Sequence, residues 1–282
     1  MIAIVTDSSA QLPDTLAAEL GVSRVPVRVT VDGTEYREGV DLDPDTFYGF
    51  WAEGAQPTIT TSQPAPGDFV DCYRRLAADG ASEILSIHVG RTWSGTCDSA
   101  RIAARQVHVP VTVIDSGSLS FGVACCVREA AEALAAGADL VDAARVVAAV
   151  APTISSVTVI GALDIARAGG RFTLATPARD GAAAPVIRIT GDETAVVGSG
   201  TTVDELAELM VATMTADPGP HRMALCVADA TAEPLRMAVD DRLGGHPGVA
   251  DLVRYRVGPS IGAHTGPGTA GGFWYPARES WI

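Results

Sequence analysis

The sequence predicts an α/β fold made of two α/β domains. The N-terminal domain is expected to have a mostly parallel sheet flanked by helices, and the C-terminal domain a mixed sheet with helices. Short apolar runs alternate with amphipathic or alanine-rich segments through the first half of the chain, which is typical of a parallel sheet covered by helices. The second half alternates in the same way but contains more hairpin signals. With 282 residues, of which 47% are hydrophobic, the chain is long enough for two packed units.

The N-terminal domain is expected over residues 1–152. Its first apolar run ends at Asp7 and two serines, which is typical of the first strand-to-helix turn of an α/β protein. Asp32-Gly33 lies between two strand-like runs and predicts a two-residue hairpin turn. The expected strands are 2–5, 23–31, 34–39, 83–88 and 109–114, and the expected helices are 12–20, one from Asp43, one from Pro66, 98–104, 121–136 and 140–151.

The C-terminal domain is expected over residues 153–282, with Pro152 marking the boundary. A hairpin is expected around Gly191-Asp192, and the glycine-rich segment 258–272 is expected to be a loop. The expected strands are 157–160, 186–190, 195–198, 222–228 and 249–257, and the expected helices are 163–168, 203–216 and 233–243.

The charge and residue usage exclude several function classes. The formal net charge is −14, so the chain should repel nucleic acid and anionic membrane surfaces, and no apolar run suits stable membrane insertion. All 20 basic residues other than histidine are arginine, which excludes a P-loop lysine and a Schiff-base lysine. The five cysteines include no C-x-x-C pair, and the N-terminus does not resemble a signal peptide, so a cytoplasmic location is expected. No histidine has metal-site spacing, and we expect no metal.

Two hydroxyl-rich segments lie directly before helices. Segment 60–66 carries Thr61 and Ser62 ahead of Pro66, and we expect it to be a polar loop that leads into a helix N-terminus. Segment 93–96 carries Ser94 at the end of a strand and the start of a helix. The N-terminus of a helix offers backbone N–H groups and a partial positive charge, so the two segments together favour an anion-binding site. Ordinary helix caps without a ligand remain the alternative.

Other motifs support an enzyme weakly. Segment 258–262 matches G-x-S-x-G, the motif of a hydrolase nucleophile elbow. Such an elbow needs a helix after it and a later Asp, but we expect no helix there and no Asp follows Ser260. A serine hydrolase using Ser94 or Ser260 is therefore kept only as an alternative function. Segment 266–271 matches G-x-G-x-x-G without a strand before it or a helix after it, which favours a tight loop. His264, flanked by glycines, and Arg171, which follows two glycines, are candidates for contacting a ligand.

The motifs taken together resemble the DegV family, the fatty-acid-binding proteins that include the binding subunits of bacterial fatty acid kinase. The similar segments occur in the family's order and cover nearly the whole chain. They are Ile4-Val5-Thr6-Asp7-Ser8-Ser9, Thr61-Ser62-Gln63-Pro64, Leu85-Ser86-Ile87-His88, Ser94-Gly95-Thr96, Val113-Ile114-Asp115-Ser116, Gly169-Gly170-Arg171 and Gly262-Ala263-His264-Thr265-Gly266-Pro267-Gly268.

The resemblance implies a long-chain fatty acid held in an apolar tunnel between the two domains, with no other cofactor. It also implies that the chain is no enzyme by itself. It would present the fatty acid carboxylate to a separate ATP-dependent kinase subunit for acyl-phosphate formation, a role in phospholipid metabolism. Gly170 and Arg171 would face the head group or the kinase subunit. The residues implied to bind the carboxylate are Thr61, Ser62, Ser94, Gly95 and His264.

The sequence departs from the family pattern near the second hydroxyl segment. Arg91 and Trp93 stand in a stretch that is usually rich in serine and ends in leucine, Cys97 replaces a usual Tyr, and Ala65 replaces a usual Ser. The departures at Arg91 and Trp93 therefore predict a head-group end or a partner face that differs in shape from that of other members of the family.

Overall fold

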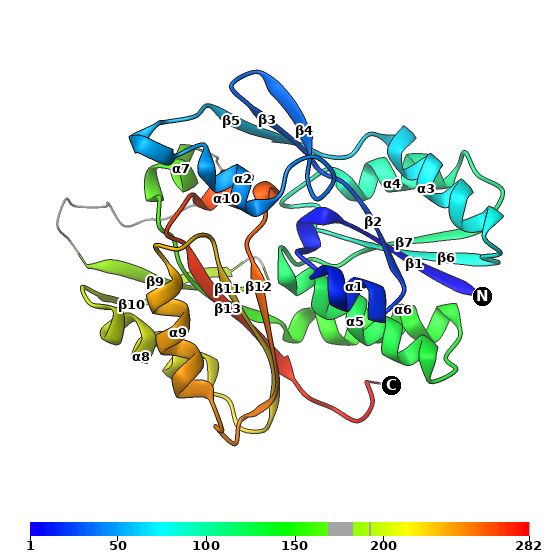
Figure 1. Ribbon diagram of the computed structural model, residues 1–282. Coiled ribbons are helices and arrows are strands. Elements are labelled where there is room, and N and C mark those ends of the chain that lie inside the picture. Colours follow the sequence, from blue (N-terminus) through cyan, green and yellow to red (C-terminus); the bar gives the residue numbers. More distant parts are fainter. Residues whose placement is uncertain (169–182, 192, 282) are drawn as a thin grey trace. The chain divides into compact units, whose positions relative to one another are not determined.

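The computed structural model describes residues 1–168, 183–191 and 193–281 (Figure 1). The chain forms two compact units. The first contains Met1–Asp41, Thr60–Pro152 and the last residues from Ser280, and the second contains Leu42–Ile59 and Thr153–Glu279. The predicted α/β class is confirmed, with a parallel sheet in the N-terminal part and a mixed sheet in the C-terminal part. Domain limits at 1–152 and 153–282 remain a prediction, and the compact units differ from them by grouping Leu42–Ile59 with the later part of the chain.

The first unit is built on a four-stranded sheet of order β2-β1-β6-β7, in which all neighbours are parallel. Figure 1 shows α3 and α4 on one face of this sheet and α5 and α6 on the other. The strands are β1 (Ile2–Asp7), β2 (Val22–Val25), β6 (Glu83–His88) and β7 (Val111–Asp115). The helices are α1 (Asp14–Glu19), α3 (Pro66–Ala78), α4 (Thr96–Ala104), α5 (Phe121–Ala135) and α6 (Leu140–Val150).

A small second sheet has the order β4-β3-β5. The predicted hairpin is present between β3 (Arg28–Val31) and β4 (Thr34–Arg37), and its turn residues Asp32 and Gly33 have φ values of 47° and 84°. The prediction that residues 60–62 form a loop was wrong, because β5 (Ile59–Ser62) is a strand. Its β-branched residues alternate between half-buried and exposed positions, which suits an extended segment at a sheet edge.

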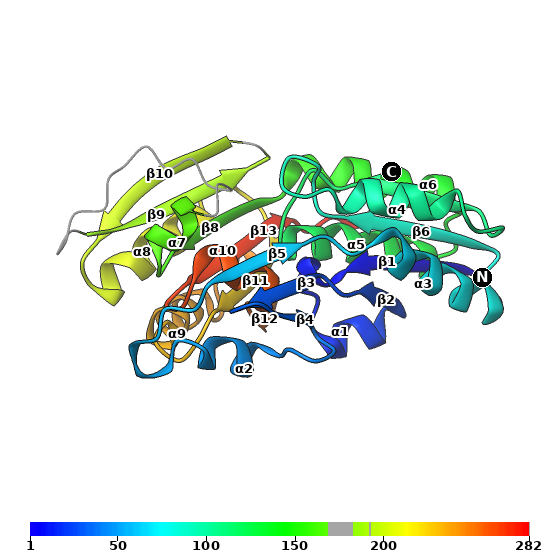
Figure 2. The ribbon, with the colours of Figure 1, turned by 90° about the horizontal axis from the view of Figure 1, so that it is seen from above.

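The second unit contains a six-stranded mixed sheet of order β10-β9-β8-β13-β11-β12, which can be followed in Figure 2. Neighbouring strands are antiparallel except for the parallel pair β11 and β12. The strands are β8 (Ser155–Val159), β9 (Ala184–Thr190), β10 (Glu193–Gly200), β11 (His221–Val227), β12 (Val249–Arg256) and β13 (Ala270–Pro276). The helices are α2 (Pro44–Gly49), α7 (Leu163–Ala168), α8 (Val203–Met214), α9 (Glu233–Leu243) and α10 (Pro259–Thr265).

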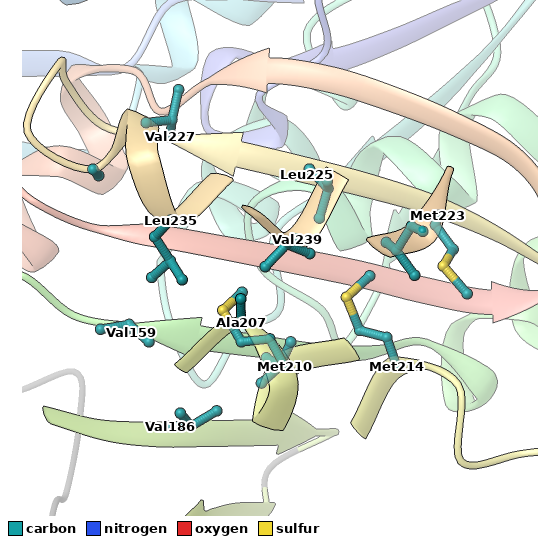
Figure 3. Close-up of a cluster of buried hydrophobic side chains, with 14 of the residues drawn as sticks. Val159, Val186, Ala207, Met210, Met214, Met223, Leu225, Val227, Leu235 and Val239 are labelled. Atoms are coloured by element: carbon teal, nitrogen blue, oxygen red, sulfur yellow. The ribbon is translucent and has the colours of Figure 1, made fainter. Parts of the chain in front are cut away.

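Helices α8 and α9 pack on one face of this sheet and form a buried apolar core with it. Figure 3 shows Met210 and Met214 of α8 and Val239 of α9 pointing toward side chains of the strands, Leu225 among them. The core therefore uses aliphatic and methionine side chains, as the low aromatic content of 5% requires.

The prediction of a loop over 258–272 was wrong. Helix α10 begins at Pro259, because Gly258 has an extended backbone and proline fits the first helical position. Strand β13 lies in the interior of the sheet between β8 and β11. Its glycines lie in close packing: a Cβ atom on Gly272 would lie 2.7 Å from the sulfur of Met214, and one on Gly271 would lie 3.0 Å from the carbonyl oxygen of Val157. The same glycines had suggested a loop.

In the described part of the chain, no helix is both long and apolar enough to cross a membrane.

Candidate functional site

The candidate site lies in the first unit, where the chain leaves the carboxyl ends of the parallel strands. In open α/β sheets, ligands bind beyond these ends. Strands β1, β6 and β7 are each followed by a polar turn that contains serine: Ser8 and Ser9 follow β1, Ser94 follows β6, and Ser116 follows β7. The N-terminal ends of α4 and α5 lie after these turns.

Ser94 forms a hydroxyl pair with Thr96 at the N-terminus of α4. The two side-chain oxygens are 2.9 Å apart, and the backbone N–H of Thr96 donates to the Ser94 hydroxyl at 3.3 Å. Gly95 is the N-cap residue of this nine-residue helix. Ser94 and Gly95 are half-buried, whereas Thr96 is buried. The arrangement combines hydroxyl donors with the positive end of a helix, which suits a carboxylate.

The first hydroxyl segment is not the cap of α3. Thr61 and Ser62 lie on β5, and Asp68 of α3 instead accepts from the backbone N–H of Ala65 at 2.9 Å. Arg28 holds the same Asp68 carboxylate at 3.1 Å. The alternative interpretation as an ordinary helix cap is therefore wrong for Thr61 and Ser62, and Ser62 is exposed.

Gln63 joins the two hydroxyl segments. A Cβ atom on Gly95 would lie 2.6 Å from Oε1 and 2.8 Å from Nε2 of Gln63, so the amide rests directly against the glycine. The same Nε2 atom donates to the Ser99 hydroxyl of α4 at a long 3.4 Å. The structure thus brings the segment of Thr61 and Ser62 beside that of Ser94 and Gly95, and sequence inspection had assigned no role to Gln63.

His264 lies in the second unit, half-buried in the last turn of α10. A Cβ atom on Gly262 would lie 2.6 Å from a ring carbon of Phe47 and 2.6 Å from the hydroxyl oxygen of Tyr48, so α2 packs tightly on the helix that carries His264. The backbone N–H of Ala162, the residue directly before α7, donates a hydrogen bond to the Thr265 carbonyl at the end of α10. The placement of His264 beside Thr61 and Ser94 remains a prediction.

The expected ligand contacts Gly170 and Arg171 lie outside the described residues. They follow α7, which ends at Ala168.

Arg91 is exposed and lies 3.7 Å from the Asp98 carboxylate. Cys97 is fully buried, its thiol lies 3.5 Å from the Val89 carbonyl, and burial raises the pKa of this thiol to about 12.

The hydrolase alternative finds weak support in the site geometry. Within the described residues, the hydrogen bonds of the Ser94 hydroxyl go to Thr96, not to a histidine. The prediction that no helix follows G-x-S-x-G was wrong, but Ser260 lies inside α10 and is only 5% exposed. A nucleophile elbow needs a strained backbone at the serine, and Ser260 is not among the described residues with positive φ. Ser120, at the start of α5, does have such a backbone (φ 49°, ψ −137°) and is buried.

A Ser-His-Asp arrangement nevertheless exists, and the sequence did not reveal it. Ser86 Oγ lies 2.7 Å from His88 Nε2, and His88 Nδ1 lies 2.8 Å from Asp7 Oδ2, which is the connectivity of a hydrolase triad. All three side chains are buried, and Tyr73 contacts the serine hydroxyl at 2.8 Å. A substrate has no access to a serine in this position. Among the described residues, no group of three or more His, Cys, Asp or Glu side chains is placed to hold a metal ion.

Comparison with known proteins identifies the family. The family model described as "Uncharacterised protein, DegV family" matches residues 1–277. The chain belongs to the DegV family. A DegV domain-containing protein of Streptomyces coelicolor is 33% identical over 275 residues, which are 96% of each chain. A DegV domain-containing protein of Deinococcus radiodurans is 32% identical over 278 residues, again 96% of each chain.

Solved structures share the fold of this chain. A DegV family protein from Thermus thermophilus, described by its fatty acid binding, is 28% identical, with a TM-score of 0.85 over 98% of this chain and 99% of that one. A stearic-acid-binding protein from Eubacterium ventriosum has a TM-score of 0.86 over 98% of each chain. At 22% identity, that second match shows a common fold alone.

Proposed function

We propose that this DegV chain binds a long-chain fatty acid through its carboxylate and buries the acyl tail in an apolar tunnel between its two domains. The observation that carries the proposal is the meeting of two hydroxyl segments at the Gln63–Gly95 contact, beyond the carboxyl ends of a parallel sheet. Fatty acid binding by the Thermus thermophilus relative supports the ligand class.

Neutral donors suit this ligand. Hydroxyls and helix N–H groups bind a carboxylate without a buried cation. Thr61, Ser62, Ser94, Gly95 and His264 are the proposed carboxylate contacts. About ten sequestered CH₂ groups would contribute roughly 8 kcal/mol before association costs, so the tail supplies most of the affinity and the head contacts fix orientation.

The chain is proposed to act without turnover of its own. Phosphoryl transfer requires metal ions and phosphate-gripping loops, and the site described above consists of hydroxyl and amide groups. We propose that the bound carboxylate is presented to an ATP-dependent kinase subunit for acyl-phosphate formation, with Gly170 and Arg171 facing that subunit or the head group. A cytoplasmic location is proposed with it, in keeping with five free, buried cysteines.

The first experiment is extraction of the purified protein with organic solvent, followed by mass spectrometry and by titration with added fatty acid. We expect fatty acid in the extract or saturable binding of the added ligand. An empty extract together with no binding of added fatty acid would refute the proposed function.

The second experiment tests the assigned residues. Loss of a hydrogen bond to a charged group costs about 1.5–3 kcal/mol, so Ser94→Ala should weaken fatty acid binding about 10- to 100-fold. Ser199→Ala, at an exposed serine of β10, is the matched control and should bind as the wild type does. Unchanged affinity in both Ser94→Ala and Thr61→Ala would show that the carboxylate lies elsewhere. Formation of acyl phosphate with added kinase subunit and ATP tests the presentation role separately.

A further inference from the structure

A buried chain of four polar side chains connects three elements of the first unit. The Tyr73 hydroxyl of α3 lies 2.8 Å from Ser86 Oγ of β6, which lies 2.7 Å from His88 Nε2. His88 Nδ1 lies 2.8 Å from Asp7 Oδ2 at the end of β1. Each of the four residues is 0% exposed. The proposed function gives this chain of side chains no role.

The contacts allow one complete assignment of hydrogens. The second carboxylate oxygen of Asp7 accepts from both the backbone N–H and the hydroxyl of Ser9, so Asp7 acts as an acceptor throughout. His88 Nδ1 must then carry a proton. If Nε2 is unprotonated, it accepts from Ser86, and Ser86 accepts from Tyr73, so every buried donor has a partner.

The competing assignment leaves a buried donor without a partner. A proton on His88 Nε2 would have to be donated to Ser86, and the Ser86 hydroxyl would then donate to Tyr73. The Tyr73 hydroxyl contacts Ser86, so its own hydrogen would be left without an acceptor at a fully buried position. An unsatisfied buried donor costs its full desolvation penalty. Neutral His88 with its proton on Nδ1 is therefore the assignment that satisfies all four groups.

The four hydrogen-bonded side chains lie on or against the elements that lead to and from the two hydroxyl segments. Helix α3 rests on them through Tyr73 and through Phe69, whose ring meets the His88 ring edge-on at 5.0 Å between centroids. Helix α3 follows the segment of Thr61 and Ser62, and the turn after His88 carries Ser94. The same histidine thus fixes the elements from which both segments extend.

We propose that neutral, Nδ1-protonated His88, held by Asp7, is a positioning residue for the fatty acid head group. The proposal rests on the proposed function, because it assigns His88 to the support of the same site. Although Ser86, His88 and Asp7 have the connectivity of a catalytic triad, we assign them no catalytic role. Their fixed donor and acceptor roles hold the surrounding elements in place.

The hydrogen assignment is tested by ¹⁵N NMR of the imidazole groups, with the His88 signal identified by its loss in His88→Gln. We expect the Nδ1–H tautomer in the wild type. In Asp7→Asn, the amide oxygen must keep the two Ser9 donors, so the amide NH₂ faces His88 and should switch it to the Nε2–H tautomer. Tyr73→Phe should retain Nδ1–H. An imidazolium or an Nε2–H tautomer in the wild type at neutral pH overturns the proposal without need of any variant.

The positioning role is tested by comparing a fatty acid with the fatty alcohol of equal chain length. We expect Asp7→Asn to weaken fatty acid binding about tenfold and fatty alcohol binding less than about twofold, because the tail site stays intact. Equal losses for both ligands would mean general structural damage, and no loss for either would mean no positioning role, so both overturn the proposal. If the wild type binds no fatty acid, the proposed function fails as well. Normal wild-type binding with unchanged selectivity in Asp7→Asn refutes the positioning role alone.

Discussion

Substitution of Gly95 by alanine tests how the two hydroxyl segments are held together. The added Cβ would lie 2.6–2.9 Å from three atoms of the Gln63 amide, inside van der Waals contact. The obstacle is the end of a flexible side chain, so Gln63 should swing away, lose its Ser99 bond and let the segments separate. Because Gln63 can yield, we expect a cost near the low end of the overpacking range, about 1 kcal/mol of unfolding free energy. The affinity for fatty acid should fall about tenfold, a larger change in free energy than the loss of stability, because the separation acts directly on the head-group contacts.

The assay is urea unfolding together with fatty acid titration of a double-mutant cycle. Gln63→Ala removes the obstacle, so Gly95→Ala should cost little stability in the Gln63→Ala background. Gly67→Ala is the matched control, because it lies in the first turn of α3 and a Cβ there meets nothing within 4 Å. Additive losses in the double variant would refute the steric reasoning. The urea unfolding measurements use no ligand, so they test the steric reasoning even if fatty acid is not the ligand.

Two further predictions concern packing and burial. Gly262→Ala should lower the free energy of unfolding by about 2–3 kcal/mol, because the added Cβ would meet the ring of Phe47, which is fully buried and has no room to move. Gly49→Ala is the control: a Cβ there meets nothing within 4 Å, so the variant should be near neutral in the same urea assay. The thiols of Cys97 and Cys226, whose pKa values burial raises to about 12 and about 11, should not react with an aromatic disulfide reagent at pH 8 until the protein unfolds. Since the unfolded thiols lose protons at lower pH than the folded ones, these cysteines should lower the free energy of unfolding as pH rises above about 9, and a rise in stability there would contradict their burial.

Local patterns were enough to predict many elements. The strand expected at 83–88 and the helices expected at 163–168 and 233–243 coincide with β6, α7 and α9. These segments have a clear apolar period and marked ends, so their local preference agrees with the fold. The Asp32-Gly33 hairpin was also predictable, because a two-residue turn with positive φ at both positions favours such a pair.

Elements set by distant packing were not predictable. The glycines of β13 serve close contacts with neighbouring strands and α8, yet glycine in a sequence normally indicates a loop. The two hydroxyl segments of the candidate site were found from their composition, but Gln63 was not, because its role depends on touching Gly95 in another element. The pair of Asp7 and His88 lies 81 residues apart in the chain, and no local pattern joins them.

The path of the chain has a consequence for the order of folding during synthesis. The parallel sheet of the first unit is complete once β7 has been made. Helix α2 is synthesised before β6 and β7, yet it packs on α10, which follows much later in the chain. The fully buried ring of Phe47 therefore has no partner in α10 until residues 259–265 have been synthesised. The last residues then return to the first unit, where the Trp281 indole donates to Glu129 at 2.8 Å. A nascent chain should thus leave the aromatic residues of α2 without this packing partner until α10 has been synthesised, and a fragment that ends at residue 152 should leave them without it permanently.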